Sequence, residues 1–196
     1  MKKIFLTLIF LSLAFTVKTI ADTSSSIQRI FEGNENAKVT IITYESLTCG
    51  HCADFHKDIY PQLKKEFIDT GLVKIEFRHF PLDMAALNAS KIAQCNNNGK
   101  SDLLHFLFSN QKKWAIGETI ENANQNLKKL LKDENILIDF EKCTNNKNIE
   151  DYVLNDRIEA VKKFKINATP AIIINNKKFE KSLNYKNLKK SIEKLI

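Results

Sequence analysis

Short β-rich runs and apolar residues at helical spacing alternate along the chain. Residues 39–44 (VTIITY) and 72–77 (LVKIEF) are predicted strands, because β-branched and aromatic residues dominate them. The stretch between them has helical character and begins just after Cys49. The first part of the fold is therefore predicted to run strand, helix, strand.

A long segment without strand character follows the second strand. From residue 84 to residue 164, apolar side chains recur at the spacing of amphipathic helices, as in Leu103/Leu107, Leu104/Phe108, Leu127/Leu130/Leu131 and Leu154/Ile158/Val161. This spacing predicts four or five helices. Because no Gly/Pro-rich linker flanks the segment, we expect an insertion over about residues 84–165 that packs on the same fold.

The last part of the chain predicts a hairpin and a helix. Residues 171–174 (AIII) and 177–180 form the expected arms, and Asn175-Asn176 between them tolerates positive φ. Apolar residues within 188–195 share one face of the closing helix. The whole order predicts an α/β fold with a central mixed sheet flanked by helices.

The first twenty or so residues differ from the rest. Two lysines precede an apolar run over residues 4–15, and small residues end at Ala21, where a signal peptidase would cut. The pattern predicts a signal peptide over 1–21 and a mature chain over 22–196. An uncleaved membrane anchor is the alternative, although the run is short for a membrane span. Export predicts a periplasmic location, which is oxidising.

Composition fits one ordered domain, since 43% of the 196 residues are hydrophobic and 27% are charged. Lys2, Lys3 and Lys18 fall in the predicted signal peptide. The mature chain therefore has 27 basic against 23 acidic residues, a net charge of +4. The basic residues are spread among acids, without a basic run interleaved with aromatics. We therefore expect no nucleic-acid partner.

The motif Cys49-Gly50-His51-Cys52 lies between a predicted strand and a predicted helix start. Two thiols on the first turn of a helix can close a small disulfide in which only the first sulfur points outward. The helix N-terminus stabilises a thiolate, and His51 can add a positive charge or a hydrogen bond. We expect Cys49 to be the nucleophile and Cys52 to be its resolving partner.

A Cys-x-x-Cys pair also binds metals. A structural zinc site needs four ligands, usually from a second close pair, and Cys95 and Cys143 do not form one. A different metal hypothesis has Cys49, His51 and Cys52 holding a soft ion such as Cu(I). We expect no metal, and the absence of a nucleotide or flavin motif predicts that the cysteine pair acts without a cofactor.

Three separated segments resemble the DsbA-like thiol:disulfide oxidoreductases. They are VTIITYESLTCGHCADFHKDIYPQL with RHFPLD in residues 39–83, QCNNNGKSDLLHFLFSNQKKW in 94–114, and NATPAIIIN in 167–175. The resemblance covers nearly the whole mature chain. It implies a thioredoxin fold with an inserted helical domain. It also implies oxidation of unfolded or reduced exported proteins, and reoxidation by a membrane quinone-linked partner resembling DsbB.

The resemblance also assigns site residues. Thr169-Pro170 matches the family's loop in which a cis proline faces the active-site disulfide and the preceding residue pairs with substrate. The dipeptide Gly50-His51 departs from the Pro-His of the usual oxidases and is typical of disulfide isomerases. Thr43 stands where many relatives carry a buried acid, and Glu45, which shares its strand parity, is the candidate replacement.

A disulfide isomerase or reductase is the alternative activity. Such an enzyme generally needs a dimerisation or trimerisation module, and residues 22–38 are too few for one. We therefore expect a monomeric oxidase.

Cys95 and Cys143 form an even pair in the helical segment of a protein expected to be exported. They predict a second disulfide, with two buried free thiols as the alternative.

The remaining candidates are assigned to structure. We expect surface or capping roles for His56 and His79, because their spacing from Cys49 suggests no catalytic part. Phe106, Phe108 and Trp114 are expected to pack in the core and the helical lid. Pro61 is expected to kink the helix after the motif.

Overall fold

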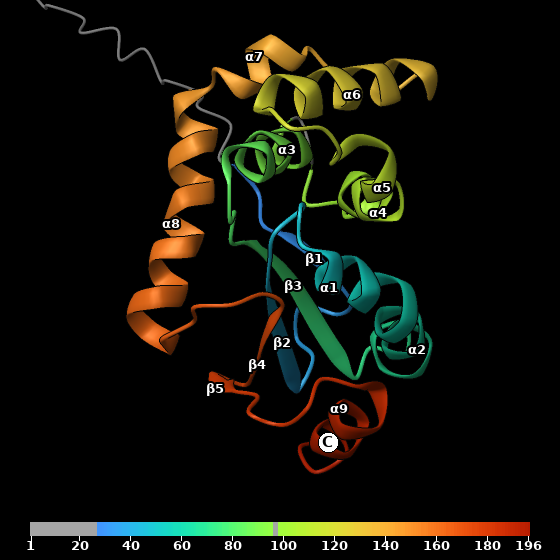
Figure 1. Cartoon of the computed structure of the whole chain (residues 1–196). Coiled ribbons are helices and arrows are strands. Elements are labelled where there is room, and N and C mark those ends of the chain that lie inside the picture. The colour runs from blue at the N-terminus through green and yellow to red at the C-terminus, as the bar shows by residue number, and fades with distance from the viewer. Residues whose placement is uncertain (1–26, 96–97) are drawn as a thin grey trace, which may run out of the picture.

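The computed structural model describes residues 27–95 and 98–196, and these form a five-stranded mixed sheet with helices on both sides (Figure 1). The predicted signal peptide over residues 1–21 lies outside the described residues. In the sheet order β1-β3-β2-β4-β5, only β2 and β3 run parallel. The strands are β1 (Ile30–Glu32), β2 (Val39–Glu45), β3 (Val73–His79), β4 (Ala171–Ile174) and β5 (Lys177–Lys178).

Helices cover both faces and both ends of the sheet. One continuous helical run joins β2 to β3 and consists of α1 (Gly50–Asp54), η1 (Phe55–Ile59), α2 (Tyr60–Leu63) and η2 (Lys64–Ile68), where η marks π-helical turns. The segment between β3 and β4 contains α3 (Met84–Gln94), α4 (Asp102–Ser109), α5 (Gln111–Trp114), α6 (Ile120–Asp133), α7 (Phe140–Thr144) and α8 (Lys147–Phe164). The closing helix is α9 (Tyr185–Ile192). In Figure 1, α8 stands on one side of the sheet, α1 and α2 on the other, and α3 to α7 beyond one end.

The strands separate two apolar clusters. Alternate residues of β3, Val73, Ile75 and Phe77, are buried in the larger cluster together with Ile41 of β2. The neighbouring residue Ile42 belongs to a smaller cluster, which α8 covers. Because successive side chains of a strand point to opposite faces, β2 is buried on both of its faces.

Short polar side chains start most of the longer helices. Each such residue accepts a hydrogen bond from a backbone N–H three positions on, which satisfies one of the unpaired donors of the first turn. Asp83 does this for α3, where its carboxylate accepts from the N–H of Ala86 at 2.7 Å. The other such caps are Thr119, Asp139, Asn146 and Asn184.

Three elements differ from the sequence-based expectation. Strand β1 was not predicted, because three residues are too few for a periodic signal. The predicted strand over 177–180 is shorter, although the N–H of Phe179 still donates to the carbonyl of Ile172 at 2.9 Å. In helix α8, Ile158 and Val161 are nearly half exposed and face away from the core. The buried face of α8 consists of Ile149, Val153, Asp156 and Ala160.

The helical run after β2 is irregular around Pro61. The π-helical turn η1 directly precedes α2, which carries Pro61 in its first turn, and η2 follows it. Proline lacks the N–H that would bond the preceding turn, so the regular hydrogen-bond pattern of the helix is interrupted there. Phe108 and Trp114 are buried as expected, and Phe106 packs partly buried against them.

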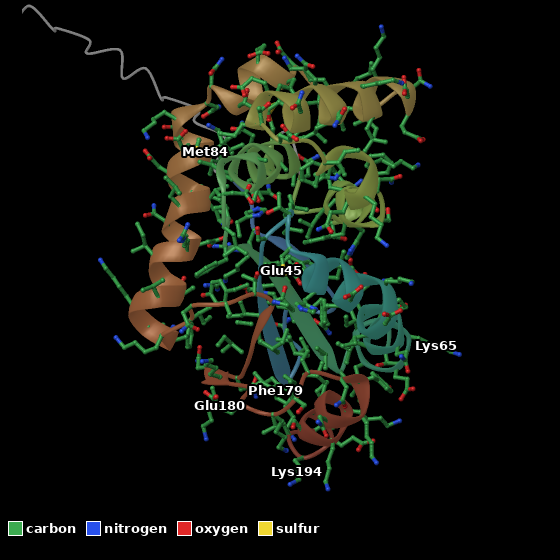
Figure 2. The ribbon with its side chains drawn as sticks, in the orientation of Figure 1. Glu45, Lys65, Met84, Phe179, Glu180 and Lys194 are labelled. Carbon is green, nitrogen blue, oxygen red and sulfur yellow. A yellow bond between two sulfur atoms is a disulfide. The ribbon has the colours of Figure 1, made fainter. Side chains whose placement is uncertain are left out.

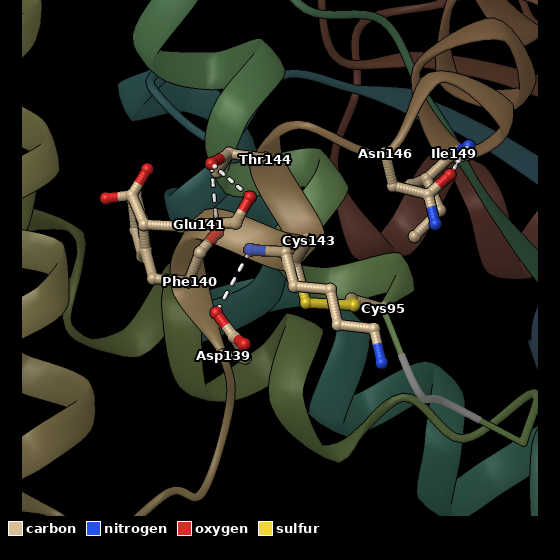
Figure 3. The surroundings of a disulfide bond; sticks show 9 residues. Cys95, Asp139, Phe140, Glu141, Cys143, Thr144, Asn146 and Ile149 are labelled. Atoms are coloured by element: carbon tan, nitrogen blue, oxygen red, sulfur yellow. Dashed lines mark hydrogen bonds between the residues drawn. A yellow bond between two sulfur atoms is a disulfide. The ribbon is translucent and has the colours of Figure 1, made fainter.

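A disulfide joins the end of α3 to α7. The sulfurs of Cys95 and Cys143 are bonded, and Figure 3 shows the bond beside the first turn of α7, where Asp139 caps the helix. The link closes a loop with a sequence separation of 48, and this loop contains α4, α5 and α6. Within the described residues, no helix combines the length and the apolar character needed to cross a membrane.

Removing this link should destabilise the protein. In the chain-entropy account, a loop of this length contributes about 4 kcal/mol by restricting the unfolded chain. We expect the double variant Cys95→Ala/Cys143→Ala to lose up to that amount of free energy of unfolding, measured by urea denaturation of the oxidised protein. An unchanged denaturation midpoint would contradict the assignment.

Candidate active site

The four-residue motif begins one loop after the end of β2. Cys49 is the N-cap of α1, and its N–H donates to the carbonyl of Ser46 at 3.0 Å. The side-chain amide of Gln111, from α5, donates to the carbonyls of Leu47 at 2.8 Å and Cys49 at 3.0 Å. The inserted helices therefore hold the loop that presents the motif.

The two thiols of the motif lie in contrasting surroundings. Both are free thiols, with Cys49 partly exposed and Cys52 completely buried. Hydrogen bonds to the Cys49 sulfur from the Cys52 thiol and from the backbone N–H groups of Cys52 and His51 lower the pKa of Cys49 to about 5, although partial burial opposes this. Cys49 is therefore a thiolate at neutral pH.

Cys52 is shifted in the opposite direction. Burial raises the pKa of Cys52 far above its usual value, and the hydrogen bond to Cys49 and the charge of Glu45 raise it further. One turn of helix thus holds an accessible thiolate and a protonated, inaccessible thiol.

The loop before β4 lies against the nucleophile. The Thr169–Pro170 peptide bond is cis, and the Cys49 sulfur lies 3.4 Å from the carbonyl oxygen of Thr169, within hydrogen-bonding distance of the thiol. The cysteine and the cis proline are 120 positions apart in sequence, and the pairing of β2 with β4 brings them together.

The two residues between the cysteines face outward. A Cβ added at Gly50 would meet no atom within 4 Å, so this position leaves open space beside Cys49. The His51 side chain is 88% exposed, and its Nδ1 lies 3.7 Å from Asp54 Oδ2. Of the two contributions expected from His51, a positive charge or a hydrogen bond, the structure shows a hydrogen bond to the Cys49 sulfur, donated by the backbone N–H of His51.

A cavity of about 1000 Å³ opens beside the motif, between the run α1–η1 and helices α4 and α5. Its wall combines apolar side chains with amide and charged groups; among them are Gly50, Ala53, Phe106, Phe108, Asn110 and Lys112. An extended peptide could lie in a groove of this size.

Glu45 is buried beneath the motif. It is the last residue of β2, and its strand parity points it to the face that the α1–η1 run covers (Figure 2). One carboxylate oxygen, Oε2, lies 2.8 Å from Nε2 of His56. The other, Oε1, is buried without a hydrogen-bond partner. The hydroxyl of Thr43 lies 3.4 Å from the carbonyl of Glu76, and Thr43 brings no acid to this face.

Comparison with known proteins identifies the family of this chain. The thioredoxin family matches residues 25–194. The solved structure of alpha-DsbA1 from Wolbachia pipientis is 30% identical, with a TM-score of 0.74, and the match covers 86% of this chain and 90% of that one. The chain belongs to the DsbA-like proteins of the thioredoxin family.

Curated relatives of this DsbA-like chain carry related names. Disulfide bond formation protein D of Bacillus subtilis is 28% identical over 172 residues, which cover 83% of this chain and 74% of that protein. A putative protein-disulfide oxidoreductase of Rickettsia bellii is 27% identical over 168 residues, which cover 84% of this chain. The chain spans 63% of the length of that rickettsial protein. The predicted thioredoxin fold with an inserted helical region is confirmed.

The expected surface or capping roles of His56 and His79 are wrong. Both side chains are buried. His56 lies four residues after Cys52 on the same helical run, which turns it inward to Glu45. His79 shares the inward parity of β3, its ring lies 3.1 Å from Gln94 Oε1, and burial lowers its pKa. Strand parity was the signal that could have predicted the burial of His79, because Glu45 and His79 are register partners across β2 and β3.

The described residues offer no ligand cluster for the hypothesis of a bound soft metal ion. Among residues 27–95 and 98–196, no group of three or more His, Cys, Asp or Glu side chains is placed to hold an ion.

The pKa of Cys49 can be tested by alkylation. Because only the thiolate reacts, the rate of modification of the reduced protein by iodoacetamide should be constant above about pH 6 and fall as the pH drops through about 5. Mass spectrometry should find one adduct, on Cys49, since Cys52 is buried and protonated. A midpoint near the ordinary thiol value of about 8.5 would contradict this electrostatic account.

Proposed function

We propose that this protein is an exported thiol:disulfide oxidoreductase that introduces disulfide bonds into other exported proteins through Cys49 and Cys52. The observation that carries the proposal is the contrast between the two thiols: an accessible sulfur with a pKa of about 5 beside a buried sulfur with a raised pKa. A stable Cys49 thiolate favours the reduced enzyme, so its disulfide tends to accept electrons from substrate thiols.

The reaction proceeds in two exchanges. A substrate thiolate attacks the Cys49 sulfur of the Cys49–Cys52 disulfide, the S–S bond breaks, and Cys52 leaves as a thiolate that takes up a proton. The second substrate thiolate then attacks the substrate sulfur of the mixed disulfide, and Cys49 leaves as a stable thiolate. Two electrons pass from the substrate to the enzyme, and the substrate gains one disulfide.

Substrate binding uses the surfaces around Cys49. The backbone of Thr169 beside the cis Pro170 is placed to pair with an extended substrate chain, and Gly50 leaves room for it. The cavity lined by Phe106 and Phe108 would take adjacent side chains. Backbone pairing with apolar contacts suits unfolded proteins of varied sequence.

We assign the site residues the roles that the sequence analysis gave them. Cys49 is the nucleophile, Cys52 resolves, Gly50 and His51 form the exposed dipeptide, and Cys95–Cys143 is structural. Glu45 is proposed to exchange a proton with Cys52, because its charge acts on that thiol and its Oε1 is buried without a partner.

Cell location and partners belong to the same proposal. The N-terminal apolar run supports export to the periplasm, and the oxidase acts as a monomer on reduced proteins. A membrane quinone-linked protein resembling DsbB would reoxidise it. Wolbachia alpha-DsbA1 and Bacillus subtilis disulfide bond formation protein D support the oxidase assignment by their names.

The proposal is tested with reduced, unfolded ribonuclease A. A stoichiometric amount of oxidised protein should restore disulfides and nuclease activity, and the Cys49→Ser variant should restore none, since it cannot form the mixed disulfide. Cys52→Ser cannot form the Cys49–Cys52 disulfide and should also restore none. With scrambled, disulfide-bonded ribonuclease, its Cys49 thiolate should open a substrate disulfide and remain attached as a mixed disulfide.

Two other outcomes separate the alternatives. Activation of scrambled ribonuclease by the reduced protein, without oxidation of the reduced form, would favour an isomerase. Tight stoichiometric copper in protein that exchanges no thiols would favour the metal-binding hypothesis.

A further inference from the structure

A chain of short hydrogen bonds leads away from the buried side of the motif. Glu45 Oε2 lies 2.8 Å from His56 Nε2, and His56 Nδ1 lies 2.9 Å from His105 Nδ1. His105 Nε2 lies 2.7 Å from Glu32 Oε1. The chain crosses from the end of β2 through η1 and α4 to β1.

Aromatic neighbours fix the two imidazole rings in this alignment. His56 stacks on Phe108 with ring centroids 4.0 Å apart, and His105 stacks on Tyr60 with centroids 4.4 Å apart. The rings therefore keep the nitrogens facing one another, as a proton path requires.

Proton counting shows that the chain holds one proton beyond those of two neutral imidazoles. Each of its three hydrogen bonds contains one proton. A neutral imidazole brings one N–H, so His56 and His105 supply two, and a carboxylate supplies none. The third proton makes one imidazole cationic or resides on a carboxyl group. An excess proton shared along such a chain can move by short hops between neighbouring atoms.

Glu45, the inner end of the chain, acts electrostatically on the Cys52 thiol, whose protonation changes during exchange. Cys52 becomes a thiolate when the disulfide opens and must lose its proton again when the disulfide closes. Burial, the Cys49 hydrogen bond and the Glu45 charge all raise the pKa of Cys52, so its thiolate is short-lived without a proton donor. His79, on the neighbouring strand, also faces Glu45 but bonds to Gln94.

The outer end of the chain reaches the surface. Glu32 accepts hydrogen bonds from Tyr60 at 2.7 Å, Lys64 at 3.1 Å and the hydroxyl of Ser101. Burial raises the pKa of Glu32, but the hydrogen bonds from His105, Ser101 and Tyr60 outweigh it and hold that pKa well below its usual range. Glu32, Lys64 and His105 line a surface cavity of about 490 Å³, where solvent protons can enter.

We propose that Glu45, His56, His105 and Glu32 form a proton relay between Cys52 and the surface. A proton given to the Cys52 sulfur from Glu45 Oε1 is replaced at Oε2 by His56, and then by His105. His105, held by the Glu32 carboxylate, takes up a proton from solvent in the surface cavity that both residues line. One proton enters for each Cys52 thiolate formed, and one leaves by the reverse path when Cys52 closes the disulfide. This relay rests on the proposed function and assigns its proton path.

The test separates the two sulfur reactions with glutathione disulfide as oxidant. Cys49 attacks it and forms a mixed disulfide, and Cys52 then loses its proton and closes the ring. In His105→Ala we expect the first step to be unchanged and the second to slow by about 10²-fold, at the lower end of what a positioned general acid–base contributes. Quenched samples analysed by mass spectrometry give both rates. His79→Ala is the matched control, since it removes a buried histidine outside the relay.

Chemical rescue distinguishes proton transfer from packing. Because His105 lines two cavities, added imidazole can enter the space left in His105→Ala, and it should restore most of the ring-closure rate. Pyrrole, which fills the same space without a basic nitrogen, should not. Glu32→Gln provides a second variant that breaks the outer end of the chain, and it should slow ring closure alone.

The outcomes are distinguishable from failure of the oxidase proposal. Ring closure in His105→Ala and Glu32→Gln at the wild-type rate would overturn the relay while leaving thiol exchange intact. Equal rescue by pyrrole would also overturn it, in favour of a packing role. If Cys49 itself forms no mixed disulfide in the wild-type protein, the proposed function fails first.

Discussion

Strand β2 hydrogen-bonds to β3 on one edge and β4 on the other and is buried on both faces. A one-residue shift of β2 would move each of its side chains to the opposite face, Thr43 and Glu45 included, and pairing on both edges opposes such a shift, so the point where β2 ends is fixed. That point sets the positions of Glu45, of the loop to Cys49 and, through β4, of the cis Pro170 loop. The site is therefore a consequence of how the central strand is packed.

The same placement shifts the pKa values of the two cysteine side chains, Cys49 and Cys52, in opposite directions. Cys49 caps the helix run where unpaired N–H groups stabilise negative charge, while Cys52, three residues later, faces the buried end of β2. A carboxylate beneath Cys52 adds to the effect of burial. Helix geometry and burial thus separate an accessible thiolate from a buried, protonated thiol.

Much of this could be predicted from the sequence because the signals are local. The Cys-x-x-Cys spacing, the run VTIITY and the helical periodicity each lie within a short window, and the resemblance in three segments supplied the fold and the Pro170 loop. The histidine pair His56–His105 could not be found in that way. His56, His105 and Glu32 meet only after β1, η1 and α4 pack together, and β1 itself is too short to recognise. The exposed position of the His51 ring likewise depends on helix orientation, not on its place in the motif.

The central claim is that this environment makes the Cys49–Cys52 disulfide strongly oxidising. The most direct measurement is its reduction potential, obtained by equilibration with glutathione in a variant lacking Cys95 and Cys143. The stable Cys49 thiolate predicts a value near that of DsbA, about −120 mV. A value near that of thioredoxin, about −270 mV, would contradict the account, because a disulfide of that potential would not readily accept electrons from substrate thiols.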